Sequence, residues 1–134
     1  MTQDSIKTRV VGVDISIDKT VFAIVDVRGN IIARDGFPTK TYPNVNEYVT
    51  YLSNCIIELV ESNGGYESIR SVGVSSPSGN FLTGCIENPP NLEWKGQIPM
   101  AAMLRDRLGL AVALGNDVHA RALGEYVYGS AHDS

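Results

Sequence analysis

Residues 111–129 read AVALGNDVHARALGEYVYG, and this stretch decides how the rest of the chain is interpreted. The apolar run from Leu110 to Leu114 is typical of a short buried strand, and the residues after Gly115 have helical spacing. A strand that passes through a tight turn into a helix places the polar residues of that turn at the carboxyl edge of a sheet. Open α/β sheets bind their ligands at this edge. Asn116 and Asp117 occupy the turn.

Asn116 and Asp117 have two interpretations, one functional and one structural. An oriented carboxylate can accept the proton of a substrate hydroxyl during phosphoryl transfer. Asn and Asp are also preferred at helix N-caps, where a side-chain oxygen accepts a hydrogen bond from a free backbone N–H. Taken alone, the pair favours the cap. Both interpretations can hold together, because a capping residue can also face a cleft.

The composition is that of an ordinary globular domain. The chain has 134 residues, of which 43% are hydrophobic, and a net charge of -4, so no general attraction to nucleic acid or anionic membranes is expected. No apolar run is long enough to span a bilayer, and the N-terminus lacks the apolar core of a signal peptide. A cytoplasmic location is therefore expected. Cys55 and Cys85 form neither a disulfide framework nor a metal-ligand cluster, so no metal site is predicted.

The first half of the chain predicts a meander of strands followed by a helix. Apolar and alternating segments predict three antiparallel strands, at 9–15, at 20–27 and a third that begins with 31–34, before Pro38 to Pro43 breaks the pattern. Asn44 is suited to the N-cap of an amphipathic helix, which is expected to stop at the Asn-Gly-Gly of 63–65. A second helix is predicted between Pro99 and Gly109.

The second half predicts strands that return to the sheet beside the first one. A fourth strand is predicted at 69–74, with the polar loop SSPSG at 75–79 and a small hairpin at 81–86. The order is then β-β-β-α-β-α-β-α, an α/β domain with a mixed five-stranded sheet flanked by helices. Helical connections make the strands before Asp14, SSPSG and Asn116 parallel, so these polar segments are expected to share one rim.

This order and its motifs resemble the N-terminal domain of the ROK family of sugar kinases and sugar-responsive repressors. The motifs are VGVDI followed by Lys19 and Thr20, then VGVSSPSG, NPPNLEWKG and LGNDVHARALGE. The resemblance extends from about Thr8 to Gly129. It implies a ribonuclease-H-like (actin-like ATPase) fold in which residues 1–134 form a single N-terminal lobe and the C-terminal lobe is absent.

The resemblance also implies roles for residues near the rim. It implies that Asp117 is the catalytic base toward the primary hydroxyl of a glucose-like hexose, and that Asn116 binds the sugar. The other residues implied to contact the sugar are Ser78, Gly79 and Asn91. Those implied to bind ATP, which acts with magnesium, are Asp14, Lys19 and Thr20. Trp94 is interpreted as an anchor for an irregular loop, in preference to a surface that stacks on a sugar ring.

Two features differ from the family pattern. The family has two glycines in its first phosphate loop, where this chain has Ser16 and Ile17, and Asp18 adds an anion where phosphates would lie. We interpret this segment as a plain hairpin turn that no longer binds anything. The chain also stops where the second lobe would begin, and half a cleft cannot hold a nucleotide in line for transfer.

The primary hypothesis is the N-terminal sugar-binding lobe of an ATP-dependent hexose kinase of the glucokinase type, inactive as an isolated chain. The alternative is a non-catalytic sugar-sensing or assembly domain of the repressor branch, which needs the sugar site and not the nucleotide. Both leave an inter-lobe surface exposed. The expected protein partner is therefore a missing C-terminal lobe or a second copy of the chain in a homodimer.

Overall fold

Apolar segments separated by turns form the five strands of the main sheet. The computed structural model describes residues 8–76, 78–80, 82–87, 94 and 96–115. The strands are β1 (Arg9–Ile15), β2 (Lys19–Asp26), β3 (Ile31–Pro38), β4 (Ile69–Ser75) and β8 (Val112–Gly115). They lie in the order β3-β2-β1-β4-β8, with β1, β2 and β3 antiparallel and β4 and β8 parallel to β1. The predicted mixed five-stranded sheet is confirmed.

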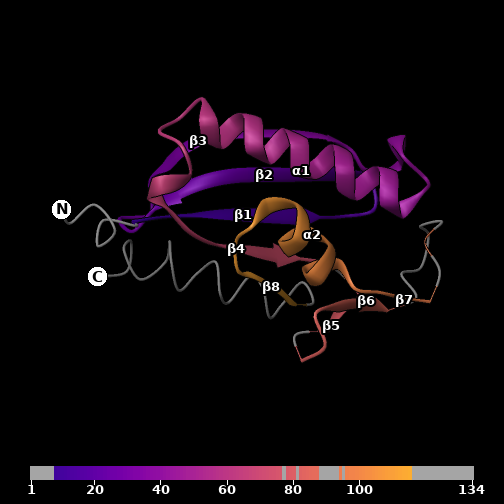
Figure 1. Cartoon of the computed structure of the whole chain (residues 1–134). Helices are drawn as coiled ribbons and strands as arrows, with labels where there is room; N and C mark the ends of the chain where they lie inside the picture. Colours follow the sequence, from indigo (N-terminus) through magenta and orange to yellow (C-terminus); the bar gives the residue numbers. More distant parts are fainter. Residues whose placement is uncertain (1–7, 77, 81, 88–93, 95, 116–134) are drawn as a thin grey trace.

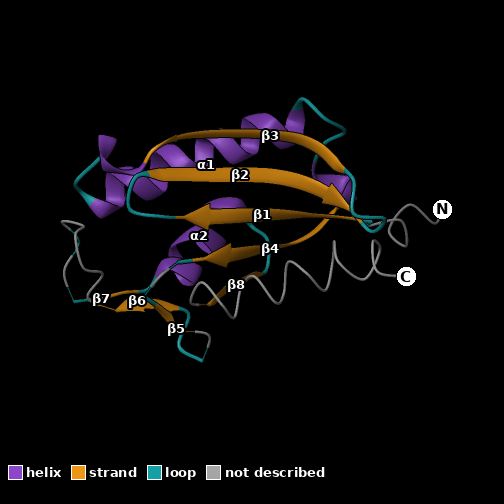
Figure 2. Ribbon diagram, turned by 180° about the vertical axis from the view of Figure 1, so that it is seen from behind, coloured by secondary structure: helices purple, strands orange, loops and turns teal. Residues whose placement is uncertain are grey.

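Two α-helices cover one face of this sheet. They are α1 (Val45–Glu61) and α2 (Met100–Leu108), and the two opposite views show both on the same side of the strands (Figures 1 and 2). Short 3-10 helices precede α1 and β4, at Thr39–Thr41 and Tyr66–Ser68. The helix predicted after β8 falls in 116–134, outside the described residues. Pro99 and Gly109 flank α2 as predicted, and Gly109 is left-handed with φ 70°.

A second, smaller sheet lies at the end of the molecule toward which β1 and β4 point (Figure 2). It consists of β5 (Gly79–Asn80), β6 (Cys85–Glu87) and β7 (Gln97–Ile98), in that order and antiparallel. The predicted hairpin exists as β5 and β6, but it begins two residues before the predicted segment 81–86 and ends one residue after it. The added strand β7 was not predicted, because two residues are too few to show a period.

The main core lies between the sheet and the two helices. Along β1, the buried Val11, Val13 and Ile15 alternate with residues of the opposite face, as a period of two requires. The residues of α1 that complete the core recur at helical spacing: Tyr48, Val49, Leu52, Ile56 and Val60. Burying this stripe, and not intrinsic propensity, supplies most of the stability of such a helix.

The edge strand β3 begins at Ile31 as predicted and includes Pro38, the residue at which the sequence predicts that the strand pattern breaks. A proline inside a strand removes a ladder hydrogen bond, so it argues against continuation in most contexts. At the outer edge of the sheet no neighbour requires that N–H. The tertiary position of β3 therefore allows a strand that the sequence alone did not support.

Asn44→Ala is expected to lower the free energy of unfolding by about 1 kcal/mol. The Asn44 side chain accepts a hydrogen bond of 3.1 Å from the backbone N–H of Glu47 at the start of α1. Urea denaturation measures the change. Asn54→Ala, at an exposed position within α1, is the matched control and should be neutral or slightly stabilising, since Ala is the better helix former. Equal losses in both variants would contradict the capping role.

Candidate ligand site at the rim of the main sheet

The carboxyl ends of three parallel strands meet in one row of the main sheet. Asp14 of β1 pairs with Ser75 of β4, and Ser75 pairs with Gly115 of β8. The predicted alignment of these strand ends is therefore confirmed. Asn116 and Asp117 directly follow Gly115 but lie outside the described residues. The position of the Asp117 carboxylate stays a prediction.

The loop after β4 makes a tight turn into the small sheet. The Gly79 N–H donates to the carbonyl of Ser76 at 3.1 Å, and the Glu87 N–H donates to the carbonyl of Ser78 at 2.9 Å. Ser78 and Gly79 therefore stand at the end of β4, close in sequence to the row at the rim. Asn91 lies outside the described residues. The sugar contacts of these three residues stay predictions.

Three residues that the sequence did not predict at the site, Asn80, Glu87 and Gln97, hold this loop in place. Asn80 donates to the Glu87 carboxylate at 3.2 Å, and its side-chain oxygen accepts from the Leu82 N–H at 2.9 Å. Gln97 of β7 donates to the same carboxylate at 3.3 Å. An Asn that bonds to the backbone two residues ahead is a common turn former, and this was the available signal for Asn80.

Trp94 is buried, with 5% of its surface exposed, and its ring centroid lies 4.6 Å from that of Tyr48. An indole packed against a residue of α1 is not available to stack on a sugar at the surface. The interpretation of Trp94 as a loop anchor is therefore supported by its placement.

The segment between β1 and β2 is a tight hairpin turn. The Ser16 N–H donates to the Lys19 carbonyl at 3.0 Å, and the Ser16 hydroxyl donates to the same carbonyl at 2.7 Å. The Thr39 N–H, from the 3-10 helix after β3, donates to the Asp18 carbonyl at 3.2 Å. These bonds hold the turn against the end of β3.

A chain of buried hydroxyls ties this turn to α1. Thr20 is fully buried, and its oxygen lies 2.6 Å from the Tyr48 hydroxyl and 2.8 Å from the Thr39 hydroxyl. The Thr39 hydroxyl donates to the Ser16 carbonyl at 2.7 Å. Each hydroxyl has a single proton. Because the Thr39 hydroxyl donates its proton to the Ser16 carbonyl, the Thr20 hydroxyl must donate to Thr39. The Tyr48 hydroxyl must then donate to Thr20.

The described residues of this turn do not fit a nucleotide triphosphate. Phosphate loops offer free backbone N–H groups to the anion. Here the Ser16 N–H is used within the turn, the Thr20 hydroxyl is committed to buried partners, and Asp18 is an exposed acid. Among the residues implied to bind ATP, Asp14 and Lys19 are exposed. Their contacts with ATP stay predictions.

The described part of the chain has neither a metal-binding cluster nor a membrane-spanning helix. Within it, no group of three or more His, Cys, Asp or Glu residues is placed to hold a metal ion. None of its helices is both long and apolar enough to cross a bilayer. Cys55 and Cys85 are both free thiols.

Tyr48→Phe is expected to make the stability less sensitive to alkaline pH. Burial raises the pKa of the Tyr48 hydroxyl well above its ordinary value of 10.0. The unfolded chain then loses this proton before the folded chain does, so stability falls as pH rises above about 10. Chemical denaturation between pH 8 and 12 measures the effect. The wild-type curve should fall more steeply than that of Tyr48→Phe, and parallel curves would contradict this role of Tyr48.

The chain was compared with known protein sequences. The sequence model of the ROK family matches residues 10–134. A glucokinase from Streptomyces coelicolor is 32% identical over 120 residues, which cover 89% of this chain and 36% of that protein. The chain thus spans little more than a third (36%) of the length of this curated relative.

The fold was compared with solved structures. A ROK family glucokinase from Streptomyces griseus, in complex with glucose and AMPPNP, superposes with a TM-score of 0.70 at 28% identity, over 90% of this chain and 37% of that one. A ROK family transcriptional regulator, a homologue of the E. coli MLC protein, gives a TM-score of 0.72 at 18% identity, over 94% and 32%. The second likeness shows the fold alone. The ribonuclease-H-like (actin-like ATPase) α/β fold is confirmed.

Proposed function

Because this chain belongs to the ROK family, we propose that it is the N-terminal sugar-binding lobe of a cytoplasmic hexose kinase of the glucokinase type. The observation that carries the proposal is its 32% identity to a glucokinase over 89% of the chain. The row formed by Asp14, Ser75 and Gly115 supports it, since a shared strand rim is where this class of sheet binds ligands.

In this proposal the residues after β8 perform the chemistry on the sugar. Asp117 is the base that accepts the proton of the primary hydroxyl, because an oriented carboxylate within hydrogen-bond reach can do so as the bond to phosphorus forms. Asn116 binds a sugar hydroxyl. The remaining sugar contacts come from Ser78, Gly79 and Asn91. A neutral polyol requires several such fixed donors and acceptors.

In this proposal the turn between β1 and β2 does not bind the nucleotide. The family implies ATP and magnesium, but the turn does not fit a triphosphate. We therefore expect no phosphoryl transfer by the 134-residue chain alone. A coupled assay with glucose, ATP and magnesium tests this expectation, and a turnover of about 1–1000 s⁻¹, typical of intact enzymes, would contradict it.

Calorimetry with glucose tests the sugar site without requiring catalysis. The chain is expected to bind glucose weakly, and Asn116→Ala or Asp117→Asn should each weaken binding about tenfold by removing a hydrogen bond to the sugar. Asn54→Ala, on the exposed side of α1, is the control and should leave the affinity unchanged. Absence of glucose binding, or equal affinity in all variants, would refute the sugar site.

A sugar-sensing domain of the repressor branch is the second candidate, and the turn between β1 and β2 favours it. A sensor needs the sugar site but no phosphate loop. In this turn the Ser16 N–H and the Thr20 hydroxyl already bond to other groups of the protein. The same calorimetry with and without ATP separates the candidates. A sugar affinity that is the same with and without ATP favours the sensor, whereas a sugar affinity that rises when ATP is present favours the kinase lobe.

A further inference from the structure

We propose that Lys19 and Arg34 bind the phosphate group of a small molecule on the face of the main sheet opposite α1 and α2. The proposal concerns a different surface from the sugar contacts of the proposed function. The site also differs from a phosphate loop. The anion would lie on the sheet face over β2 and β3, and not at the turn between β1 and β2.

The candidate site is an open hollow of about 260 Å³ on β2 and β3. Its lining residues are Lys19, Val21, Arg34, Asp35 and Gly36. Val21 pairs with Gly36 across the two strands, and Arg34 pairs with Ala23. The Val21–Gly36 pair is therefore the floor of the hollow, with Lys19 at one end and Arg34 at the other.

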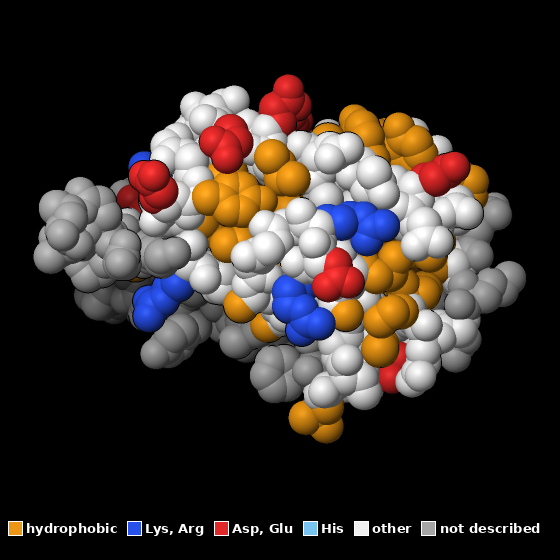
Figure 3. All heavy atoms as spheres, in the orientation of Figure 1, with side chains coloured by type: hydrophobic (Ala, Val, Ile, Leu, Met, Phe, Trp, Pro, Cys, Tyr) orange, Lys and Arg blue, Asp and Glu red, His pale blue; other side chains and the backbone are white. Residues whose placement is uncertain are grey.

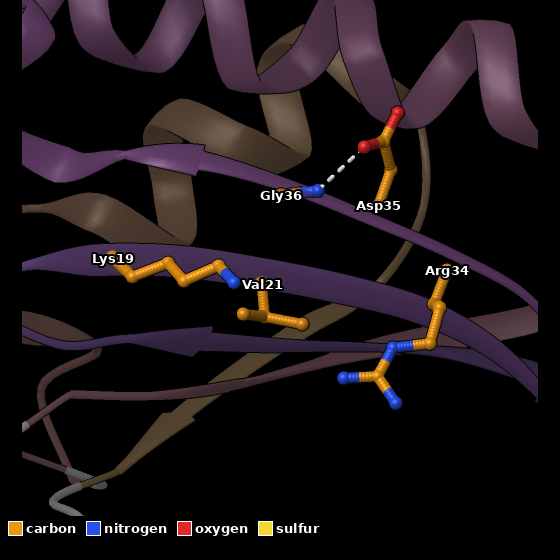
Figure 4. A pocket seen from close by; sticks show the side chains of 5 residues that line it. All are labelled: Lys19, Val21, Arg34, Asp35 and Gly36. Carbon is orange, nitrogen blue, oxygen red and sulfur yellow. Dashed lines mark hydrogen bonds between the residues drawn. The ribbon is translucent and has the colours of Figure 1, made fainter.

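The Lys19 side chain extends toward this floor, whereas the Arg34 side chain leads away from Gly36 across the ribbon of β2 (Figure 4). Figure 4 shows Lys19 extending along β2 toward Val21, and the guanidinium of Arg34 on the same side of the strands. Among the described residues, neither Lys19 nor Arg34 has a hydrogen-bonded or ion-paired partner for its side chain. Gly36 has no side chain to fill the space between them.

The nearest acid on β3 does not neutralise this pair. Asp35 pairs with the core residue Phe22 and its carboxylate points to the α1 side, where it accepts a hydrogen bond of 2.8 Å from the Gly36 N–H (Figure 4). Asp14 of β1 pairs with Val21 and therefore lies on the same face of the sheet as Lys19. The face that carries α1 and α2 shows acidic and basic side chains interspersed (Figure 3).

The two cations that line the hollow favour a phosphate group. A guanidinium donates two parallel hydrogen bonds to a phosphate, and an ammonium adds a point charge. The volume of about 260 Å³ lies below the roughly 300–1000 Å³ of sites for drug-sized ligands. It accommodates a phosphate or a small phosphate monoester, whereas a nucleotide would extend beyond it.

Nuclear magnetic resonance of the 134-residue chain tests this site directly. Sodium phosphate and glycerol phosphate are titrated in parallel at low and constant ionic strength, with sodium chloride as the compensating salt. We expect saturable shifts at the amides of 19–21 and 34–36, with an affinity on the order of 1 mM, because the charges are exposed to water. Tighter binding of glycerol phosphate would identify a monoester as the source of the phosphate, and equal binding would identify free phosphate.

Arg34→Gln and Lys19→Gln are each expected to weaken phosphate binding about tenfold, and the double variant should abolish it. Arg28→Gln removes the same charge at the far end of the β2–β3 hairpin and should change the affinity less than about twofold. If Arg28→Gln lost as much phosphate affinity as Arg34→Gln and Lys19→Gln, the effect would come from net charge only, and the proposed site would be overturned. So would an absence of saturable shifts at 19–21 and 34–36 up to about 50 mM phosphate.

Discussion

Thr39→Val is expected to lower the free energy of unfolding by about 1–3 kcal/mol. The Thr39 hydroxyl donates to the Ser16 carbonyl at 2.7 Å and lies 2.8 Å from the Thr20 hydroxyl, which donates to it. Valine has a similar shape but neither donates nor accepts. The substitution therefore leaves the proton of the buried Thr20 hydroxyl without an acceptor, which costs about 1–3 kcal/mol. The Ser16 carbonyl also loses its donor, but Ser16 is exposed and water can replace that hydrogen bond.

Urea denaturation of Thr39→Val and of Thr41→Val separates this network from the general effect of the substitution. Thr41 belongs to the same 3-10 helix but is exposed, so its replacement should change stability by less than about 0.5 kcal/mol. Tyr48→Phe should fall between the two, because it removes only the terminal donor of the chain of hydroxyls. Similar losses at Thr39 and Thr41 would mean that the hydroxyl network does not stabilise the turn.

The same series tests the direction of the hydroxyl chain. If Tyr48 donates to Thr20 and Thr20 donates to Thr39, the three groups act as one unit and their effects are not additive. The double variant Thr39→Val with Tyr48→Phe should then cost less than the sum of the single variants. Strict additivity would indicate that the two hydrogen bonds are independent.

Gly36→Ala is expected to destabilise the chain by about 1–3 kcal/mol through steric overlap. A Cβ at Gly36 would lie 2.7 Å from the backbone carbonyl oxygen of Thr20, which cannot move without disturbing β2. The contact is with backbone and not with the flexible end of a side chain. The pairing of β2 with β3 must therefore shift to relieve it, and thermal denaturation measures the resulting loss.

Gly12→Ala is the matched control for this prediction. Gly12 is also within a strand of the main sheet, but no heavy atom lies within 4 Å of a Cβ built there, counting the described residues. Its replacement should be neutral or stabilise by up to about 1 kcal/mol, because alanine has fewer unfolded conformations. A large loss at Gly12 would instead reveal that another segment packs on this face. Equal stability of Gly36→Ala and the wild type would contradict the close contact with Thr20.

The sequence predicted the elements of the fold better than it predicted the candidate site. Asn44 caps α1 and Gly109 ends α2, because capping and left-handed turns depend on a few neighbouring residues. Thr20 was predicted to contact ATP from its place in a motif. Its hydroxyl is enclosed by Thr39 and Tyr48, which lie 19 and 28 residues away in the sequence, and its contact with ATP stays a prediction. No local pattern reports partners at such separations.

The sequence by itself determined the order of strands and helices, and the alternation that assigns Val11 and Val13 to the core face of β1. These features follow from periods of two and of about 3.6 residues, which are local. Only the tertiary structure decided the register that sets Val21 opposite Gly36 and so leaves a hollow between Lys19 and Arg34. Alternation states which face a side chain takes, but the residue that it meets on the next strand depends on how the strands slide against each other.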